Sequence, residues 1–253
     1  MELNLTDRVY LVTAASSGLG FATARQLVDE GARVILVARR AEVLAQRRAE
    51  LGEDRAVTLT GDLIDPETPA RACALALETF GRLDGAMISV GGPPGGTALE
   101  NTEEQWRGAF ESVFLAGLRA IDAVVAAATG PDPVIGMVLS SSARFPSPGL
   151  TISNGLRPGL AMLVKQYATE LGPRGIRLFG LLPGYVGTER MEWLINNGDD
   201  PDARRREFTE KIPLGRIGEP AEFGRTAAFL LSPAASYLTG ILVPVDGGML
   251  PMP

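Results

Sequence analysis

The sequence predicts an α/β protein in which a doubly wound parallel sheet of about seven strands carries helices on both faces. Short apolar runs alternate with segments of helical periodicity along the whole chain, and such alternation is typical of a parallel sheet. The apolar residues 9–12 lead into the glycine-bearing residues 16–20, as expected where a buried strand turns into a helix. No repeat, linker or low-complexity segment interrupts the 253 residues, so we expect one domain over residues 1–253.

Strands are expected at short apolar runs, and helices where apolar residues recur with a helical period. In chain order the expected strands are residues 9–13, 33–37, 57–60, 85–89, 134–140, 177–182 and 241–245. The expected helices are residues 18–30, 40–51, 65–80, 102–128, 154–171 and 220–231.

Several helix ends carry local sequence signals. Gly31 is expected to end the first helix. Asp65-Pro66 forms a cap and first-turn pair, and residues 102–105 read Thr-Glu-Glu-Gln, a capping box. Pro158 lacks an N–H, so we expect its helix to begin late, with Pro158 near the first turn. The charged residues 196–211 are too few for a domain and fall in a stretch expected to be irregular.

Composition excludes several classes of function. The net charge of −6 argues against a nucleic-acid or anionic-membrane partner. The chain has no histidine and only Cys73, which excludes a Ser-His-Asp triad, an internal disulfide and a multi-cysteine metal site, so we expect no metal. The N-terminus lacks a signal-peptide pattern and no apolar run is long enough to span a bilayer, so we expect a cytoplasmic protein.

The turn after the first strand is the strongest candidate for a binding site. Gly18 and Gly20 remove side chains where the chain turns and a ligand approaches its backbone. The helix that follows directs free N–H groups and a positive dipole end at the turn, which favours a phosphate. The spacing resembles the Thr-Gly-x-x-x-Gly-x-Gly turn of the short-chain dehydrogenase/reductase family, with Ala14 in place of the first glycine. The alternative is a tight connection without a ligand.

The resemblance extends along the chain and implies a Rossmann-type fold with a dinucleotide cofactor. Residues 182–188 resemble the family's Pro-Gly-x-Val-x-Thr loop at the nicotinamide, and residues 239–248 resemble its last strand and turn. Asp62 resembles the acid that reads adenine, with an ordinary turn aspartate as the alternative. The implied cofactor contacts are Thr13, Ser16, Ser17, Gly18, Leu19, Gly20, Arg39, Asp62, Leu63, Gly91, Arg157, Pro183, Gly184, Val186 and Thr188.

The end of the second strand predicts the choice of cofactor. Ala38 stands where an acid would bind the adenosine ribose and select NAD. Arg39 follows, and a guanidinium suits the 2′-phosphate of NADP. We therefore expect NADP(H) to be favoured over NAD(H), with an ordinary solvated arginine as the alternative interpretation of Arg39.

The family's catalytic positions are altered in this chain. Hydride transfer to a carbonyl builds negative charge on oxygen, which members neutralise with a tyrosine whose pKa a lysine lowers. Ser140 keeps the family's serine, whereas Ser153 and Arg157 stand at the tyrosine and lysine positions. Val113 aligns with the family's asparagine, and Lys165 lies too far along the helix to substitute. A serine hydroxyl is a weaker acid than a phenol, and an arginine does not relay protons.

Two functions remain open. The resemblance implies an atypical NADP(H)-dependent oxidoreductase acting on a carbonyl or hydroxyl compound, similar to 3-oxoacyl-ACP reductases. The alternative is a non-catalytic dinucleotide-binding protein, a sensor or subunit, whereas a lyase or isomerase has no supporting base. Ser140 and a substrate lid with Met191, Trp193 and Leu194 as its apolar wall favour the enzyme, although the same lid pattern also suits an amphipathic surface helix.

Further expectations concern the substrate and the assembly. Arg157 is expected to clamp an anion or a ribose, and with Arg144 near the same mouth it favours an anionic small-molecule substrate. Tyr185 is a candidate surrogate acid, with packing as its alternative role. The helices over residues 102–128 and 154–171 are those that the family pairs between subunits, which implies a homotetramer or dimer.

Overall fold

A computed structural model describes residues 2–197 and 200–251. Its centre is a seven-stranded sheet in the order β3-β2-β1-β4-β5-β6-β7, and every pairing in it is parallel. The expected fold class is therefore confirmed. The strands are β1 (Val9–Thr13), β2 (Arg33–Ala38), β3 (Ala56–Thr60), β4 (Gly85–Ser89), β5 (Val134–Val138), β6 (Arg177–Pro183) and β7 (Ile241–Val245).

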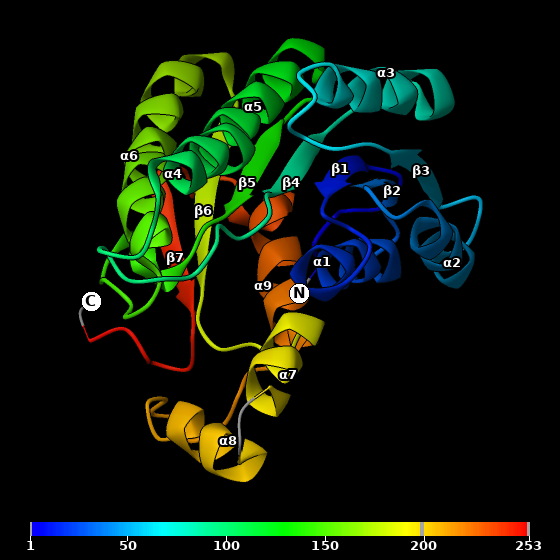
Figure 1. The fold of residues 1–253 in the computed structure, drawn as a ribbon. Coiled ribbons are helices and arrows are strands. Elements are labelled where there is room, and N and C mark those ends of the chain that lie inside the picture. The colour runs from blue at the N-terminus through cyan, green and yellow to red at the C-terminus, as the bar shows by residue number, and fades with distance from the viewer. Residues whose placement is uncertain (1, 198–199, 252–253) are drawn as a thin grey trace.

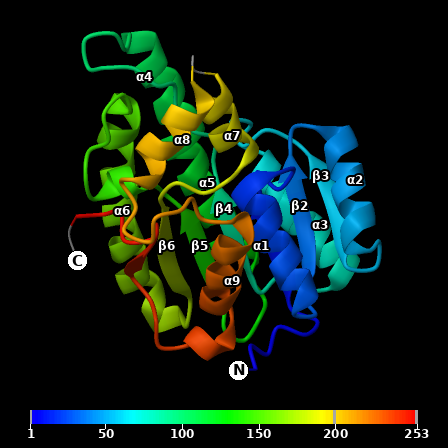
Figure 2. The ribbon, with the colours of Figure 1, turned by 90° about the horizontal axis from the view of Figure 1, so that it is seen from below.

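Helices cover both faces of the sheet, and each face has its own apolar core (Figure 1). One face carries α3 (Thr68–Phe80), α5 (Ala116–Ala127) and α6 (Thr151–Leu171). The other carries α1 (Gly18–Asp29), α2 (Ala41–Leu51) and α9 (Pro220–Leu231). Helices α1 and α9 lie side by side (Figure 2). Gly224 permits this close approach, since a Cβ there would be 2.5 Å from the Ala22 carbonyl oxygen.

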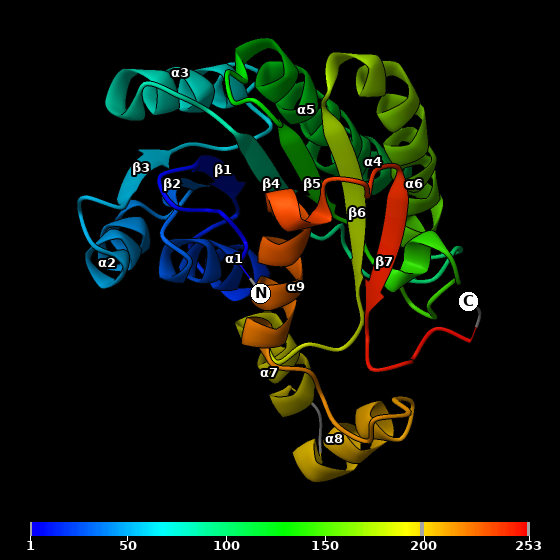
Figure 3. The same ribbon diagram turned by 180° about the vertical axis from the view of Figure 1, so that it is seen from behind.

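Two short helices stand apart from the layers. α7 (Glu189–Asn196) and α8 (Pro201–Thr209) project beyond the carboxyl ends of β6 and β7 in both side views (Figures 1 and 3). The prediction of an irregular stretch was wrong here, because Thr188 and Asp200 supply side-chain caps that start these helices. Residues 198 and 199 of the charged stretch lie outside the described residues.

Two other helix starts differ from prediction, each because of a local side-chain contact. α3 begins at Thr68, since the Asp65 carboxylate accepts hydrogen bonds from the Glu67 N–H and the Thr68 hydroxyl in a preceding turn. α6 begins at Thr151, with Pro158 in its interior. There the Asn154 side chain bonds the N–H and carbonyl of Ser147 at 3.0 and 2.9 Å, and so anchors the first turn.

The long helix expected over residues 102–128 is divided. Its capping box is present, with Thr102 and Gln105 bonding each other's backbone N–H. α4 (Glu103–Ala109) is followed by the π-helical turn η1 (Phe110–Leu115), and only then by α5. β5 ends at Val138, two residues before the predicted end. No helix within the described ranges is long and apolar enough to cross a membrane.

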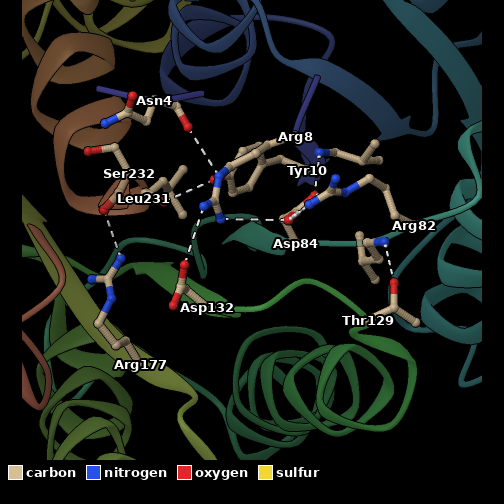
Figure 4. A network of polar contacts seen from close by, with 12 residues as sticks. Asn4, Arg8, Tyr10, Arg82, Asp84, Thr129, Asp132, Arg177, Leu231 and Ser232 are labelled. Carbon is tan, nitrogen blue, oxygen red and sulfur yellow. Dashed lines mark hydrogen bonds and ion pairs between the residues drawn. The ribbon is translucent and has the colours of Figure 1, made fainter. Parts of the chain in front are cut away.

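A network of polar side chains joins the amino ends of the strands (Figure 4). Asp84 is fully buried and accepts hydrogen bonds from the Val9 N–H at 2.9 Å and from Arg82 Nε at 2.8 Å. Arg177 donates to three carbonyl groups at and beyond the end of α9, those of Leu230, Ser232 and Leu238. The network ties β1, β4 and β6 to the end of α9, because each buried polar group must find a partner.

Removing the Asp84 carboxylate should destabilise the whole domain. Asp84→Ala leaves the Val9 N–H unpaired and removes the acid that Arg82 contacts, so we expect the free energy of unfolding to fall by about 3–5 kcal/mol. Asp132→Ala is the control, because this exposed carboxylate pairs with Arg8 at 3.3 Å and its loss should cost under about 1 kcal/mol. Urea unfolding of both variants measures the two losses of unfolding free energy. Equal losses would contradict the structural role of Asp84.

Candidate active site

A cleft of about 900 Å³ opens at the carboxyl ends of the strands. It lies where β1 and β4 are neighbours, the point at which the strand order reverses. Ligands of open parallel sheets bind at such a switch point. The β1–α1 turn, the ends of β2 and β3, the loop after β4, helix α6 and the start of α7 line the cleft.

The β1–α1 turn presents backbone to the cleft. Gly18 has φ +57°, and a Cβ at Gly20 would lie 2.6 Å from the Ala14 carbonyl oxygen, so both positions suit glycine. Ser17, the N-cap of α1, makes no capping hydrogen bond within the described chain. The first N–H groups of α1 therefore keep no side-chain acceptor and are available to an anion.

Most predicted site residues line this cleft, and two do not. Thr13 is fully buried below it, where its hydroxyl exchanges 2.7 Å hydrogen bonds with the N–H and carbonyl of Ser89. Val186 lines a separate cavity beside β7. The structure brings together in the cleft Ser16, Ser17, Gly18, Leu19, Gly20, Arg39, Asp62, Leu63, Gly91, Ser140, Ser153, Arg157, Pro183, Gly184 and Thr188.

One end of the cleft holds two consecutive arginines. Arg39 is 3.7 Å from the Asp62 carboxylate. Arg40 donates to the hydroxyls of Ser16 and Ser17 at 3.2 Å each. Sequence reasoning missed Arg40, although its place directly after Arg39 was a usable signal.

The other end gathers the three candidate catalytic residues. Ser140 lies just beyond β5, and its hydroxyl accepts a hydrogen bond from the Ser142 N–H at 3.2 Å. Ser153 and Arg157 project from α6, where the Ser153 hydroxyl is 2.8 Å from that of Ser142. Arg157 Nη1 donates to the Val138 carbonyl at 2.9 Å. Arg157 is only 5% exposed, and it is one of the residues that line the cleft.

The charge on Arg157 is costly in this position. Burial, and to a lesser extent the charge of Arg190, lower the pKa of its guanidinium to about 10. Its Nε has no hydrogen-bond partner among the described residues. That nitrogen is buried, so only the terminal nitrogens of the guanidinium can meet a ligand in the cleft, and within the described residues they make one hydrogen bond, to Val138.

Neither tyrosine nor lysine is among the residues that line the described cleft. Tyr185 packs edge-on against Phe208, with ring centroids 4.7 Å apart, and lines the cavity beside β7. Lys165 is exposed and lies against Gly240, outside the cleft. Val113 is buried in the π-helical turn. The Ser140, Ser153 and Arg157 side chains thus occupy the deep end without a phenol or an amine.

Two expectations about the mouth of the cleft were wrong. Arg144 donates to the Leu242 carbonyl on β7 and does not line the cleft. The expected apolar wall is also absent from the described lining, because Met191 packs inward against the α7–α8 pair while Trp193 is exposed. The first turn of α7 supplies Glu189 and Arg190 to the lining instead.

Arg190 was not predicted from the sequence. Its guanidinium lies over the loop after β4, where a Cβ added at Gly92 would collide with it. No motif marks this position, because its approach to Gly92 depends on the path of the chain between β6 and α7.

The fold defines a Rossmann-type α/β protein with a cleft at the switch point of the sheet. The family model described as enoyl-(acyl carrier protein) reductase matches residues 13–250. The human dehydrogenase/reductase SDR family member 4 is 35% identical, over 96% of this chain and 88% of its own. The L-rhamnose 1-dehydrogenase (NAD(P)(+)) of Azotobacter vinelandii is 32% identical over 97% of each chain. The chain belongs to the short-chain dehydrogenase/reductase family of oxidoreductases.

Solved structures agree with this assignment. The L-sorbose reductase of Gluconobacter frateurii, solved with NADPH and L-sorbose, superposes with a TM-score of 0.94 at 27% identity over the full length of both chains. A short-chain oxidoreductase of Pseudomonas aeruginosa PAO1, described as containing an atypical catalytic center, gives a TM-score of 0.91 at 27% identity. That match covers 97% of this chain and 98% of the other.

Ala14 provides a test of the turn. Its φ of +50° lies in the left-handed region, where a residue with a Cβ is strained by about 1–2 kcal/mol. Glycine removes that strain, but it also costs about 0.5–1 kcal/mol of stability because the unfolded chain gains conformational freedom. We therefore expect Ala14→Gly to raise the free energy of unfolding by roughly 0.5–1 kcal/mol.

The control is Ala15→Gly, at a buried neighbour without a positive φ, which should lower the stability. Circular dichroism during urea unfolding reports both values. An Ala14→Gly variant no more stable than the native protein would contradict the strain.

Proposed function

We propose that the protein is an NADP(H)-dependent oxidoreductase that interconverts a carbonyl and a hydroxyl compound, similar to 3-oxoacyl-ACP reductases but with altered catalytic residues. The proposal depends on one observation: the uncapped start of α1 and the side chains of Ser140, Ser153 and Arg157 line the same cleft. The NADPH complex of the structurally similar L-sorbose reductase supports it.

The residues of the cleft fit a dinucleotide. The first turn of α1 offers backbone N–H groups and a positive dipole end to a pyrophosphate. Gly91 leaves open space, because a Cβ there would meet no atom of the described residues within 4 Å. Asp62 lines the cleft beside the end of β3 and would bind the adenine amino group. When bound, the cofactor would supply or accept the hydride.

Arg39 and Arg40 support the preference for NADP(H). They stand side by side at the end of β2, where both line the cleft. An added 2′-phosphate would accept charge-assisted hydrogen bonds from their guanidinium groups. Arg39 lies 3.7 Å from Asp62, and Arg40 lies 3.8 Å from Glu189. Both arginine side chains remain exposed despite these ion pairs, so they can turn toward a phosphate.

The chain's own residues perform two tasks in the proposed reaction. The Ser140 and Ser153 hydroxyls would donate hydrogen bonds to the substrate oxygen, and Arg157 would stabilise the negative charge that develops near it. The proton would come from water or from a hydroxyl, with Ser142 placed to hold the Ser153 hydroxyl at 2.8 Å. An arginine charged throughout the cycle acts here as a fixed cation, not as a proton relay.

A non-catalytic dinucleotide-binding protein is the second candidate, because no tyrosine or lysine lines the described cleft. Titration with NADPH, followed by a panel of carbonyl and hydroxyl compounds, separates the two. Turnover of any member of the panel supports the enzyme. Tight NADPH binding without turnover supports the sensor or subunit.

We also propose a homotetramer or dimer. Phe110 and Met162 are large apolar side chains that remain exposed on η1 and α6. These are the segments that the resemblance pairs between subunits, and exposed apolar side chains of this size favour burial in an interface.

Cofactor preference should depend on Arg39. Because a charge-assisted pair contributes roughly 1.5–3 kcal/mol, the native protein should bind NADPH about 10- to 150-fold more tightly than NADH. Arg39→Asp should reverse this preference, as measured by fluorescence titration. Arg107→Asp is the control, since this arginine on α4 has the same side-chain exposure, 79% against 78%. Equal affinities of the native protein for both cofactors would refute the role of Arg39.

Catalysis should improve when the family's residue pair is restored. General acid–base help is worth roughly 10²–10⁴-fold, so the native protein should turn over ordinary family substrates slowly. Ser153→Tyr with Arg157→Lys should raise the rate, and Ser153→Tyr alone should raise it less, because an isolated phenol keeps a high pKa. Pro158 needs no change, since α6 already begins at Thr151.

Steady-state kinetics with NADPH measures the rates, and circular dichroism with NADPH titration confirms that the variants fold. A native protein that already reduces these substrates at typical enzyme rates would show the prediction wrong, and Ser140 would then be the first group to test as the acid.

A further inference from the structure

The charges that line the cleft do not balance. Four arginines line it, Arg39, Arg40, Arg157 and Arg190, against two acids, Asp62 and Glu189. Asp62 lies 3.7 Å from Arg39 and Glu189 lies 3.8 Å from Arg40. The remaining two arginines have no acidic partner among the described residues, although the chain as a whole carries a net charge of −6.

Arg157 has far fewer partners than a buried arginine needs. Arg177, the other buried arginine of the described chain, donates to three carbonyl groups. Arg157 is buried to a similar extent but makes one hydrogen bond within the described structure, to Val138. A buried cation with so few partners is unfavourable, so a ligand that satisfies it would be stabilised.

Arg190 lines the same cleft from the first turn of α7. It follows Thr188 at the start of α7, and its guanidinium lies over Gly92 in the loop after β4. It is exposed and makes no hydrogen bond or ion pair within the part of the chain that the structure describes. Its charge is close enough to Arg157 to lower the pKa of that group. Both arginines line the same cleft, and two positive charges without an acidic partner there favour an anion.

We propose that the substrate is a small oxo or hydroxy acid whose carboxylate binds between Arg157 and Arg190, with its carbonyl or hydroxyl group at Ser140 and Ser153. This inference rests on the proposed function and narrows its substrate class. In the reducing direction, the oxo acid gains a hydride at the carbonyl carbon and a proton on oxygen, and NADPH is oxidised to NADP⁺. The carboxylate passes through the reaction unchanged and serves recognition only.

The test compares two ketones that differ in charge and by one methyl group. Acetoacetate and methyl acetoacetate carry the same ketone, and only the first carries a carboxylate. Malonate, which has no ketone to reduce, measures binding of the acid without turnover. We expect the native protein with NADPH to favour acetoacetate over its ester at least tenfold in kcat/KM, because charge-assisted hydrogen bonds are specific to the acid.

The test variant is Arg190→Gln. Arg190 is an exposed residue of α7, so its replacement should not disturb the core. The loss of kcat/KM for acetoacetate should exceed the loss for its ester at least tenfold, and malonate affinity measured by calorimetry should fall by a similar factor. Arg205→Gln is the matched control, since this exposed arginine on α8 pairs with Glu192 at 2.9 Å and does not line the cleft. It should leave both measurements within twofold.

The outcomes separate this inference from the proposed function. Without turnover of either ketone, malonate binding that Arg190→Gln weakens still supports the anion site, whereas the absence of malonate binding overturns it. Equal use of acid and ester by the native protein also overturns it. If Arg190→Gln weakens NADPH binding and leaves the preference for the acid unchanged, Arg190 holds the cofactor and the inference is wrong.

Discussion

The hydroxyl of Thr13 decides where this protein has a cleft. β1 and β4 pair from Tyr10–Gly85 to Val12–Met87, and just beyond these pairs the Thr13 side chain bonds both backbone groups of Ser89, two residues after Met87. The last backbone groups of β4 are therefore hydrogen-bonded without a further strand pair, and the chain after each strand follows its own path. The turn into α1 and the loop after β4 form two walls of the cleft as a result, so Thr13 supports the site from below.

The strands were predictable because the sheet is buried on both faces, which requires continuous apolar runs. The ends of the helices were less predictable from the sequence. The shift of α3 depends on two hydrogen bonds to the Asp65 carboxylate, and the early start of α6 depends on the hydrogen bonds between Asn154 and Ser147. Such contacts are made by single side chains, and a periodic pattern cannot reveal them. The π-helical turn η1 likewise has no period of its own in the sequence.

The candidate site divides in the same way. Residues fixed by their distance from a strand end, such as Ser140 and Arg39, were predictable, because the carboxyl ends of parallel strands meet at one edge. Ser153 and Arg157 followed from their spacing after Ser140, one helical turn apart on α6. Arg190 reaches the cleft only because the chain crosses over it between β6 and α7. Its contribution depends on tertiary structure, for which the local sequence carries no signal.

The two buried arginines show how the same side chain serves the fold or the site. Arg177 stabilises the end of α9 because three carbonyl groups replace the water it loses. Arg157 gives up its water for one carbonyl group, and a second cation is held nearby, which makes its position less favourable still. A fold under no other constraint would lose such a charge, since an apolar residue of similar size avoids the cost of desolvation. Both arginines leave a buried Nε without a partner, so the difference between them lies in the terminal nitrogens, and those of Arg157 line a cleft where a ligand can replace the water that the side chain has lost.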